Sequence, residues 1–426
     1  MSELVISLPS SARLAPATDR VPDRPAVTVR TATTTSPSVP TYTVDVVTDR
    51  AGLESHRVAW DMLSSRAAEP NVFYEPWMLL PAIDAFGGST SFRIAFIYRS
   101  QPGSLAPREL CGFFPFEIIR RSAWTGTTVL RLWRHQHCFL GTPLIHQDHV
   151  AAVWHTVLNW ASASRPTPWW LDLSHQSAEG PLWPALLEVA RQREQTIYPV
   201  EPFHRAVLHR AEKFDRYCQQ AMSAHFRQEL RRKRRRLGEL GDLELRVLEE
   251  TDRIDEWIEH FLQVEALGWK GRESSALASS ADQRTFFESM ACGAFARKKL
   301  HLMGLFLDGR PIAMKCNLLT APGAFSFKIG FDESLSKFSP GVLLEWDNTR
   351  WLHEQTEIHW MDSCAKPGHF MIGQLWKDRR LLHRLLIPTC RRGELALAMR
   401  PLLHAVRRLH RQSGAPVAAL PSKETP

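Results

Sequence analysis

The chain has 426 residues, 44% of them hydrophobic, and 15 tryptophans, so it is long enough for two folded domains with large cores. It contains no apolar run of about 18 residues, and its N-terminus lacks a basic region followed by a long apolar stretch, so we expect neither a membrane span nor a signal peptide. The formal net charge of +8 predicts an acidic partner without distinguishing among a nucleotide cofactor, RNA and an anionic lipid surface.

The seven cysteines are scattered without any CxxC spacing. They are Cys111, Cys138, Cys218, Cys292, Cys316, Cys364 and Cys390. Zinc sites and disulfide frameworks usually appear in a sequence as closely spaced cysteines. The pattern therefore predicts no metal site and no disulfide framework, and it favours a reducing, cytoplasmic location.

The two ends of the chain have an unusual composition. Residues 1–40 contain six prolines and no aromatic residue, so this segment cannot bury enough apolar surface to fold. We expect a disordered N-terminal arm there. The composition after Gly414 is similar, and we expect residues 401–426 to form a C-terminal tail.

Between these ends, the same order of predicted elements occurs twice. The first half shows a helix, three strands, a helix and a strand, over residues 51–66, 92–99, 110–119, 127–133, 149–164 and 169–173. The second half repeats this order with a helix at 254–262, strands at 300–307, 312–319 and 324–331, a helix from Ser339 and a strand at 358–362. We therefore predict an α/β fold with a mixed sheet and two tandem domains, over residues 41–212 and 213–400.

Two local patterns support this organisation. Asp308-Gly309 is a dipeptide typical of a tight β-hairpin turn, here between strands 300–307 and 312–319. The last strand of each half also contains a similar tripeptide, Trp170-Leu171-Asp172 and Trp360-Met361-Asp362. Three residues can match by chance, so the repeated order of elements is the stronger indication.

A helix predicted at residues 215–240 connects the two domains and carries a dense run of positive charge. The run consists of Arg227 and Arg231 to Arg236, with Lys233 among the arginines. The apolar residues form one stripe, which indicates an amphipathic helix with a basic face. Two interpretations remain, a solvated linker helix and a helix whose arginines contact phosphate groups. Because no aromatic residue interrupts the run, stacking on nucleic-acid bases has no support.

The residues that follow strand 324–331 are typical of an anion-binding helix start. Ser339 suits an N-cap, Pro340 suits the first helical position, and Gly341 leaves the backbone open to a close neighbour. Free N–H groups and the positive end of the helix dipole would then face a diphosphate. The alternative is simply a well-capped helix.

These residues resemble a known family. The strand, the Phe-Ser-Pro-Gly turn and helix, and the strand ending in Asp362, preceded by an Arg-rich helix and by Trp269-Lys270-Gly271, are similar to GNAT acyltransferases. The narrower resemblance is to the GNAT group linked to bacterial cellulose and exopolysaccharide synthesis, which is related to the tandem-GNAT, Fem-type aminoacyltransferases. It covers about residues 226–380, whereas the first half matches only in outline and is expected to be a degenerate copy.

The resemblance implies that acetyl-coenzyme A, or another acyl-coenzyme A, binds where strands 324–331 and 358–362 separate. The cofactor-binding residues implied are Phe338, Ser339, Pro340, Gly341, Val342 and Lys328. The usual GNAT diphosphate loop carries Arg or Gln and several glycines, so this turn departs from the family pattern. No metal takes part in the implied chemistry.

Direct acyl transfer requires a group that removes a proton from the acceptor and one that protonates the leaving thiolate. Four candidates follow the last strand. Asp362 is a candidate base or a turn cap, and His369 is a candidate base with a suitable pKa. Cys364 is a candidate proton donor, a nucleophile or an inert buried thiol, and Ser363 is a candidate donor to the thioester oxygen or a turn residue.

The resemblance also indicates residues for the wall of the acceptor site. Gln374 to Arg380 is predicted to begin a basic helix, with Trp376 and Lys377 as wall residues, or with Trp376 packed inward. Glu265, Trp269 and Lys270 come from the region that covers the acceptor in this fold.

The sequence thus predicts an acyl-coenzyme A-dependent N- or O-acyltransferase whose acceptor is a small molecule, a saccharide or a protein group. Two alternatives remain open. One is a Fem-like transferase that takes its donor from aminoacyl-tRNA, which is the reading in which a nucleic acid would be a partner. The other is a GNAT-like binding or scaffold protein without turnover.

Overall fold

A computed structural model describes residues 3–6, 40–101, 106–122, 126–268 and 277–400. The strands are β1 (Glu3–Ile6), β2 (Thr41–Val47), β3 (Phe92–Ser100), β4 (Glu109–Ser122), β5 (Thr127–Leu132), β6 (Leu144–Ile145), β7 (Trp170–Ser177), β8 (Tyr198–His209), β9 (Leu243–Val247), β10 (Leu300–Leu307), β11 (Arg310–Thr320), β12 (Gly323–Phe331), β13 (Trp360–Asp362) and β14 (Asp378–Pro388). The α-helices are α1 (Arg57–Arg66), α2 (Pro76–Phe86), α3 (Val150–Ala163), α4 (Leu182–Gln192), α5 (Phe214–Ala221), α6 (Ala224–Gly238), α7 (Ile254–Ala266), α9 (Ala281–Phe295), α10 (Pro340–Glu354), α11 (Phe370–Leu375) and α12 (Arg391–Ala398). Five short 3₁₀ helices are described, η1 (Ala51–His56), η2 (Val72–Tyr74), η3 (Gln147–His149), η4 (Leu277–Ser279) and η5 (Glu333–Phe338), of which η3 and η5 precede α3 and α10.

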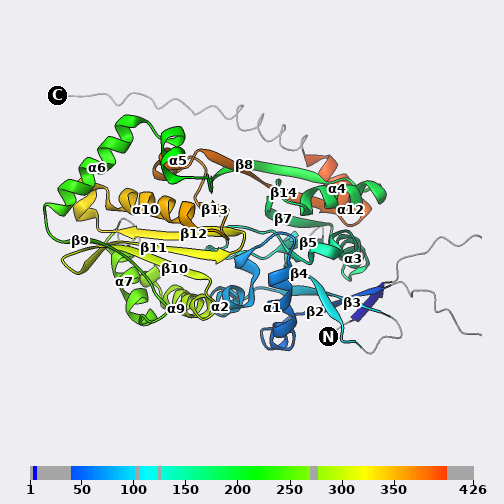
Figure 1. The fold of residues 1–426 in the computed structure, drawn as a ribbon. Helices are drawn as coiled ribbons and strands as arrows, with labels where there is room; N and C mark the ends of the chain where they lie inside the picture. Colours follow the sequence, from blue (N-terminus) through cyan, green and yellow to red (C-terminus); the bar gives the residue numbers. More distant parts are fainter. Residues whose placement is uncertain (1–2, 7–39, 102–105, 123–125, 269–276, 401–426) are drawn as a thin grey trace, which may run out of the picture.

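The described strands form one mixed, 14-stranded sheet whose two halves repeat each other (Figure 1). Its order is β1-β2-β3-β4-β5-β7-β14-β8-β13-β12-β11-β10-β9, and β6 pairs with β4. The pairs β5–β7 and β12–β13 are parallel. The halves also exchange their last strands, because β8 pairs with β13, β14 pairs with β7, and both pair with each other. This exchange makes the sheet continuous.

Helices cover both faces of this sheet (Figure 1). On one face, α1, α2, α7 and α9 pack into a single apolar cluster that spans both halves and includes Trp60 and Phe286. On the other face there are two clusters. One, around Trp154, lies under α3 and α4, and the other, around Leu344, lies under α5, α6 and α10. Alternate residues of β3 enter different clusters, as expected of a strand buried on both sides.

The predicted α/β fold with a mixed sheet and two tandem halves is confirmed. The Asp308-Gly309 turn has φ values of 49° and 76°, which a tight primed hairpin turn requires. The two similar tripeptides occupy equivalent positions, because Trp170 to Asp172 form the whole parallel pairing of β7 with β5, and Trp360 to Asp362 that of β13 with β12.

Other predictions need correction. The basic stretch at 215–240 is two helices, α5 and α6, which are separated at Met222-Ser223, where Ser223 caps α6 through a bond from the Phe226 amide to its Oγ. Residues 378–388 form strand β14 rather than a basic helix. The backbone of β14 forms hydrogen bonds with β7 on one side and β8 on the other, which makes the sheet continuous.

Part of the predicted N-terminal arm, Glu3–Ile6, forms β1 and pairs with β2, while residues 7–39 of the arm and the predicted tail at 401–426 lie outside the described residues. Among the helices that are described, none combines the length and the apolarity needed to cross a bilayer.

Candidate functional site

The parallel strands β12 and β13 stay together for only a short distance. Three residue pairs join them, and the last is Phe325 with Asp362. Strand β12 continues to Phe331 and remains paired with β11 on its other edge. From Ser326 onward, no described strand pairs with the edge of β12 that faced β13, and the backbone of Ser326 and Phe327 lies beside a cavity instead.

A cavity of about 530 Å³ lies beside this part of β12, within the size range of small-molecule sites. Its lining residues are Gln136, His137, Phe139, Gln283, Ser326, Phe327, Lys328, Ile329, Glu345, Ser363, Cys364, Ala365, Lys366, His369, Met371 and Ile372. The first three belong to the loop between β5 and β6 in the first half of the chain. His137 is stacked on Phe286 of α9, with ring centroids 5.4 Å apart. Both halves therefore build the site, whereas the sequence assigned it to the second domain.

A buried polar network forms one side of this cavity, and the sequence analysis missed it. Lys315 Nζ on β11 donates to Ser326 Oγ at 2.6 Å and to Glu345 Oε2 at 2.7 Å. The Lys315 and Glu345 side chains are both 0% exposed. Asn348 Nδ2 donates to the other Glu345 oxygen at 2.8 Å. The available signal was a lysine within the otherwise apolar strand pattern Ile312-Ala-Met-Lys-Cys316, where a buried charge demands a partner.

The turn predicted to bind the diphosphate does start helix α10, but two of its three predicted backbone donors already form hydrogen bonds within the protein. Ser339 adopts a left-handed conformation with φ 54°, and its side chain does not cap the helix. The amides of Ser339 and Val342 donate to the carbonyls of Ser336 and Ser339 at 2.9 and 3.0 Å. Gly341 is the remaining predicted donor. It lies against the Phe331 ring, which a Cβ at position 341 would approach to 2.8 Å. Phe338 and Pro340 are buried.

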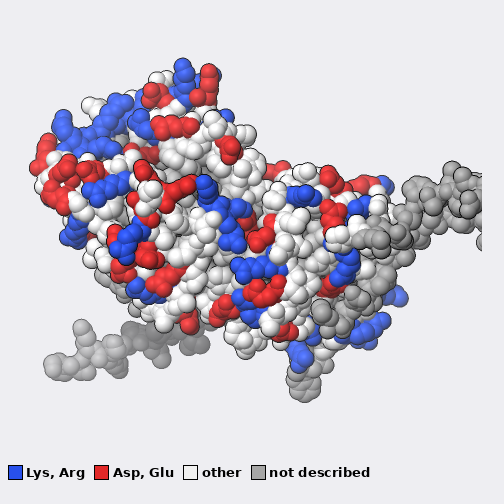
Figure 2. Space-filling view, turned by 60° about the horizontal axis from the view of Figure 1, so that its bottom comes forward, with Lys and Arg blue, Asp and Glu red and all other residues white. Residues whose placement is uncertain are grey.

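The basic helix α6 packs on this turn. The interpretation of this helix as a solvated linker did not include such a contact. Lys233 Nζ donates to Ser339 Oγ at 2.8 Å, and Arg234 forms an ion pair with Asp347 of α10. Burial raises the pKa of Asp347, and the Arg234 charge opposes that rise. Arg231 and Arg235 on the outer side of α6 are exposed, and basic side chains gather at this end of the molecule (Figure 2). The helix thus brings one ammonium group to the start of α10.

Asp362 is not among the residues that line the cavity. Its side chain is 0% exposed and contacts Arg205 and Arg380, each at 3.4 Å. Its Oδ1 also accepts the Cys364 amide at 2.8 Å. These contacts favour the turn-capping alternative for Asp362. Its counterpart Asp172 is also 0% exposed and paired with arginine, but through two bonds from the single residue Arg384.

The other three candidates for the chemistry line the cavity. Cys364 is buried with φ 54°, and burial, followed by the charge of Asp362, raises the pKa of its thiol well above the usual value. A neutral thiol of this kind favours the inert alternative. Ser363 Oγ accepts the Ala365 amide at 3.3 Å, as a turn residue does. His369 is exposed at the start of α11, on the solvent side of the cavity.

The predicted wall residues have different positions. Lys328 lines the cavity and contacts the buried Glu265, which lies behind it, at 3.3 Å. Trp376 is 0% exposed and donates to Thr349 Oγ1, so it packs inward, and Lys377 is exposed and does not line the cavity. Trp269 and Lys270 lie outside the described residues.

Comparisons with known proteins agree with this arrangement. Residues 224–370, about a third of the chain, match the sequence model of the acetyltransferase (GNAT) domain. A search of curated proteins finds no match. Among solved structures, FemX is similar with a TM-score of 0.52 and 8% identity, over 78% of this chain and 95% of that chain.

Two further solved structures have lower scores. One is the C-terminal domain (DUF2156) of a putative lysylphosphatidylglycerol synthetase from Agrobacterium fabrum, with a TM-score of 0.47 and 12% identity over 82% of this chain and 95% of that chain. The other is a tandem GNAT protein from the clavulanic acid biosynthesis pathway, with a TM-score of 0.40 and 13% identity over 82% and 99%. At such identities, likeness between structures concerns the fold alone. Residues 224–370 thus match the acetyltransferase (GNAT) domain, within a chain whose fold is similar to that of FemX.

Proposed function

We propose that this protein is an acyl-coenzyme A-dependent acyltransferase, in which an amine or hydroxyl acceptor attacks the thioester directly. The observation that carries the proposal is the separation of β12 from β13 after Phe325, beside the 530 Å³ cavity. The match of residues 224–370 to the GNAT domain supports it. The acceptor belongs to a small molecule, a saccharide or a protein, and the narrower link to exopolysaccharide synthesis remains part of the proposal.

The co-substrate would lie along the edge of β12 that continues beyond Phe325. The backbone of Ser326 and Phe327 provides hydrogen-bonding groups for the amides of pantetheine, as an added strand would use them. The diphosphate would lie at the start of α10, where the Gly341 amide and the Lys233 ammonium group are its partners. Lys233 supplies the cation that the turn itself lacks.

Ser326 is our candidate for stabilising the reacting thioester. Lys315 can only donate, so Ser326 Oγ accepts the Lys315 bond and keeps its own proton for donation into the cavity. A hydroxyl fixed in this way can donate to the oxygen that becomes negative during attack. His369, at the exposed side of the cavity, is the candidate base for the acceptor. Asp362 and Cys364 position the loop between them.

Calorimetry with acetyl-coenzyme A and a thiol-release assay over a panel of amines and sugars test the proposal. Ala365→Trp places a large ring in the cavity, so we expect it to abolish binding and thiol release. Val58→Trp is the matched control, because Val58 is 77% exposed on α1 in the first half. Binding without thiol release by any acceptor would indicate a scaffold protein, and equal binding by both variants would place the co-substrate elsewhere.

A second candidate, transfer from aminoacyl-tRNA, is favoured by one observation. The outer side of α6 exposes Arg231, Arg232, Arg235 and Arg236. A row of exposed arginines of this kind can bind the phosphate groups of RNA. Gel-shift titration with tRNA at two salt concentrations distinguishes the candidates, because Arg235→Glu/Arg236→Glu should weaken tRNA binding strongly in this case and leave acetyl-coenzyme A binding unchanged.

A further inference from the structure

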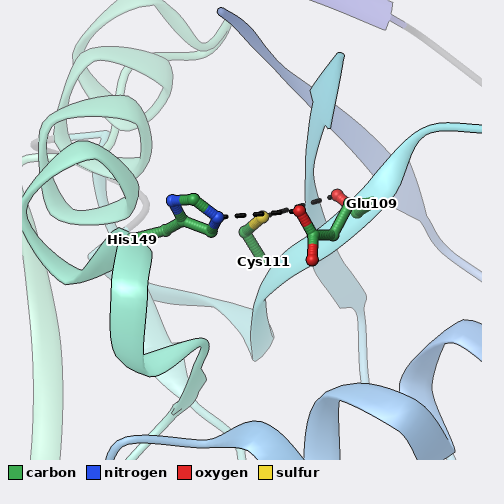
Figure 3. A group of neighbouring side chains, drawn as sticks. All are labelled: Glu109, Cys111 and His149. Carbon is green, nitrogen blue, oxygen red and sulfur yellow. Dashed lines mark hydrogen bonds and ion pairs between the residues drawn. The ribbon is translucent and has the colours of Figure 1, made fainter. Parts of the chain in front are cut away.

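A second group of reactive side chains lies in the first half, outside the proposed catalytic cavity (Figure 3). Glu109 and Cys111 lie on β4 and His149 at the end of η3, and one possible ligand atom of each lies within 4.8 Å of the others. His149 Nε2 is 3.6 Å from Glu109 Oε2. In Figure 3, the Cys111 sulfur lies between the imidazole and the carboxylate. All three side chains therefore converge on one point.

The local fold explains the convergence. Glu109 and Cys111 are two residues apart on one strand, so both side chains leave the same face of β4. Strand β6 pairs with β4 through Gly112 and Ile145, and this pairing brings the following turn η3 beside Cys111. The carboxylate is 34% exposed and the His149 ring 18% exposed, while the thiol is buried, so solvent reaches the group from one side.

Two further polar side chains, Tyr42 and His146, lie next to these three. Tyr42 Oη lies 3.3 Å from His149 Nδ1, which leaves Nε2 of that ring directed at Glu109. His146 is 95% buried, and its Nε2 has no hydrogen-bond partner among the described residues. That Nε2 faces Glu109 Oε1 at 3.8 Å. A hydrogen bond that orients a histidine ring, as that of Tyr42 does here, is typical of metal ligands, and the unpartnered His146 nitrogen is a buried polar atom directed at the group.

We propose that Glu109, Cys111 Sγ and His149 Nε2 bind a zinc ion, with water as the fourth ligand. Sulfur, imidazole and carboxylate are the donors that Zn²⁺ prefers. Ligand atoms around tetrahedral zinc are roughly 3.3–3.8 Å apart, as follows from Zn–ligand bonds of about 2.0–2.3 Å, so the group needs only a modest contraction. A bound ion would link the start of β4 to η3, the turn that precedes α3.

The charges of the occupied site balance. Binding breaks the S–H bond of Cys111, the sulfur keeps the electron pair and forms the Zn–S bond, and the proton leaves to solvent. One thiolate and one carboxylate then neutralise the two charges of the ion. Glu109 also contacts Arg99 at 3.3 Å and Arg66 at 3.7 Å, and one carboxylate oxygen must move from these partly exposed guanidinium groups toward the ion.

Titration of the metal-free full chain with Co²⁺ as a spectroscopic probe tests the site. We expect one equivalent to bind with a thiolate-to-cobalt charge-transfer band and the visible bands of tetrahedral cobalt. The charge-transfer band should disappear in Cys111→Ser and persist in Cys390→Ser, because Cys390 lies outside the group. A band that persists in Cys111→Ser, or the absence of any such band in the wild type, would overturn the proposal.

Because the Cys111 thiol is buried, its replacement can disturb the fold, so a second measurement uses a different variant. His149→Gln changes a partly exposed ring, and circular dichroism of the metal-free protein checks its fold. Zn²⁺ should raise the thermal midpoint of the wild type and release about one proton, and it should do neither in His149→Gln. Equal stabilisation of both proteins by Zn²⁺ would show that the ion binds elsewhere and would reject the site.

Discussion

Lys315 Nζ lies 2.7 Å from Glu345 Oε2, and neither side chain reaches solvent. The pair joins β11 to α10 directly beside the candidate cavity, and Ser326 completes the coordination of the ammonium group. A buried ion pair seldom adds net stability, but removing one partner leaves an uncompensated charge in the core. The pair therefore fixes the positions of the residues around the cavity rather than simply strengthening the fold.

Breaking this pair should be costly, and removing it entirely should cost less. We expect Lys315→Met or Glu345→Met to lower the free energy of unfolding by about 3–5 kcal/mol. In Lys315→Met/Glu345→Met no buried charge remains, so the loss should be smaller than the sum of the single effects. Urea unfolding of the four proteins measures the cycle, and strictly additive losses would mean that the two groups do not interact.

Ser326→Ala tests the proposed donor to the thioester. Loss of a preorganised donor of this kind lowers kcat by about 10²-fold or more, whereas KM should stay within about twofold because the hydroxyl acts mainly in the transition state. Ser363→Ala is the comparison, because its hydroxyl accepts a turn amide, and we expect its kcat within about threefold of the wild type. The reverse ranking in steady-state kinetics would assign the role to Ser363.

Lys233→Met tests the diphosphate site at α10. A hydrogen bond to a charged group contributes about 1.5–3 kcal/mol, so the Kd for coenzyme A should rise about tenfold or more, and less at high salt. Arg235→Met on the same helix is the control, because Arg235 is exposed and pairs with Glu239. If calorimetry gives both variants the wild-type Kd, the diphosphate lies away from the start of α10.

Asp362→Asn separates a catalytic role from a structural one. The change leaves the largely buried Arg205 and Arg380 without their shared carboxylate, so we expect a loss of about 3–5 kcal/mol in unfolding free energy. For a positioning residue, kcat of the folded fraction should stay within a few-fold, whereas loss of a general base lowers kcat by about 10²–10⁴-fold. Asp172→Asn, at the equivalent position of the other half, should show a similar stability loss and wild-type kcat.

The buried imidazole of His301 predicts a dependence of stability on pH. Burial, followed by the charge of Lys315, lowers the pKa of His301 to about 3 in the folded chain. The unfolded chain, with a histidine pKa of about 6.5, binds more protons between these values, so stability is full above pH 6.5 and falls as the pH drops toward 3.

At pH 5, this histidine should account for a loss of about 2 kcal/mol relative to pH 7. His301→Phe keeps the ring that stacks on Trp351, with centroids 3.8 Å apart, and removes the titrating group. Urea unfolding at both pH values should therefore give the variant a smaller difference than the wild type. An equal difference would assign the pH dependence to other groups.

The sequence by itself determined the order of elements and the fold class, because these depend on short-range patterns. The spacing of apolar residues located most strands of β3 to β5 and β10 to β12, and Asp308-Gly309 defined a hairpin. Pro340 and Gly341 marked the start of α10 correctly, although the Ser339 side chain bonds to Lys233 instead of capping it.

Tertiary structure decided the rest. The exchange of β8 and β14 joins the two halves, whose residues meet at the cavity, as His137 and Ser326 do. The pairing of β6 with β4 brings His149 beside Cys111 at the proposed zinc site. No local pattern records such contacts, because each depends on which strands pair and on which face the side chains lie. For the same reason, the spacing of the cysteines gave no sign of a metal site whose ligands are assembled from β4 and η3.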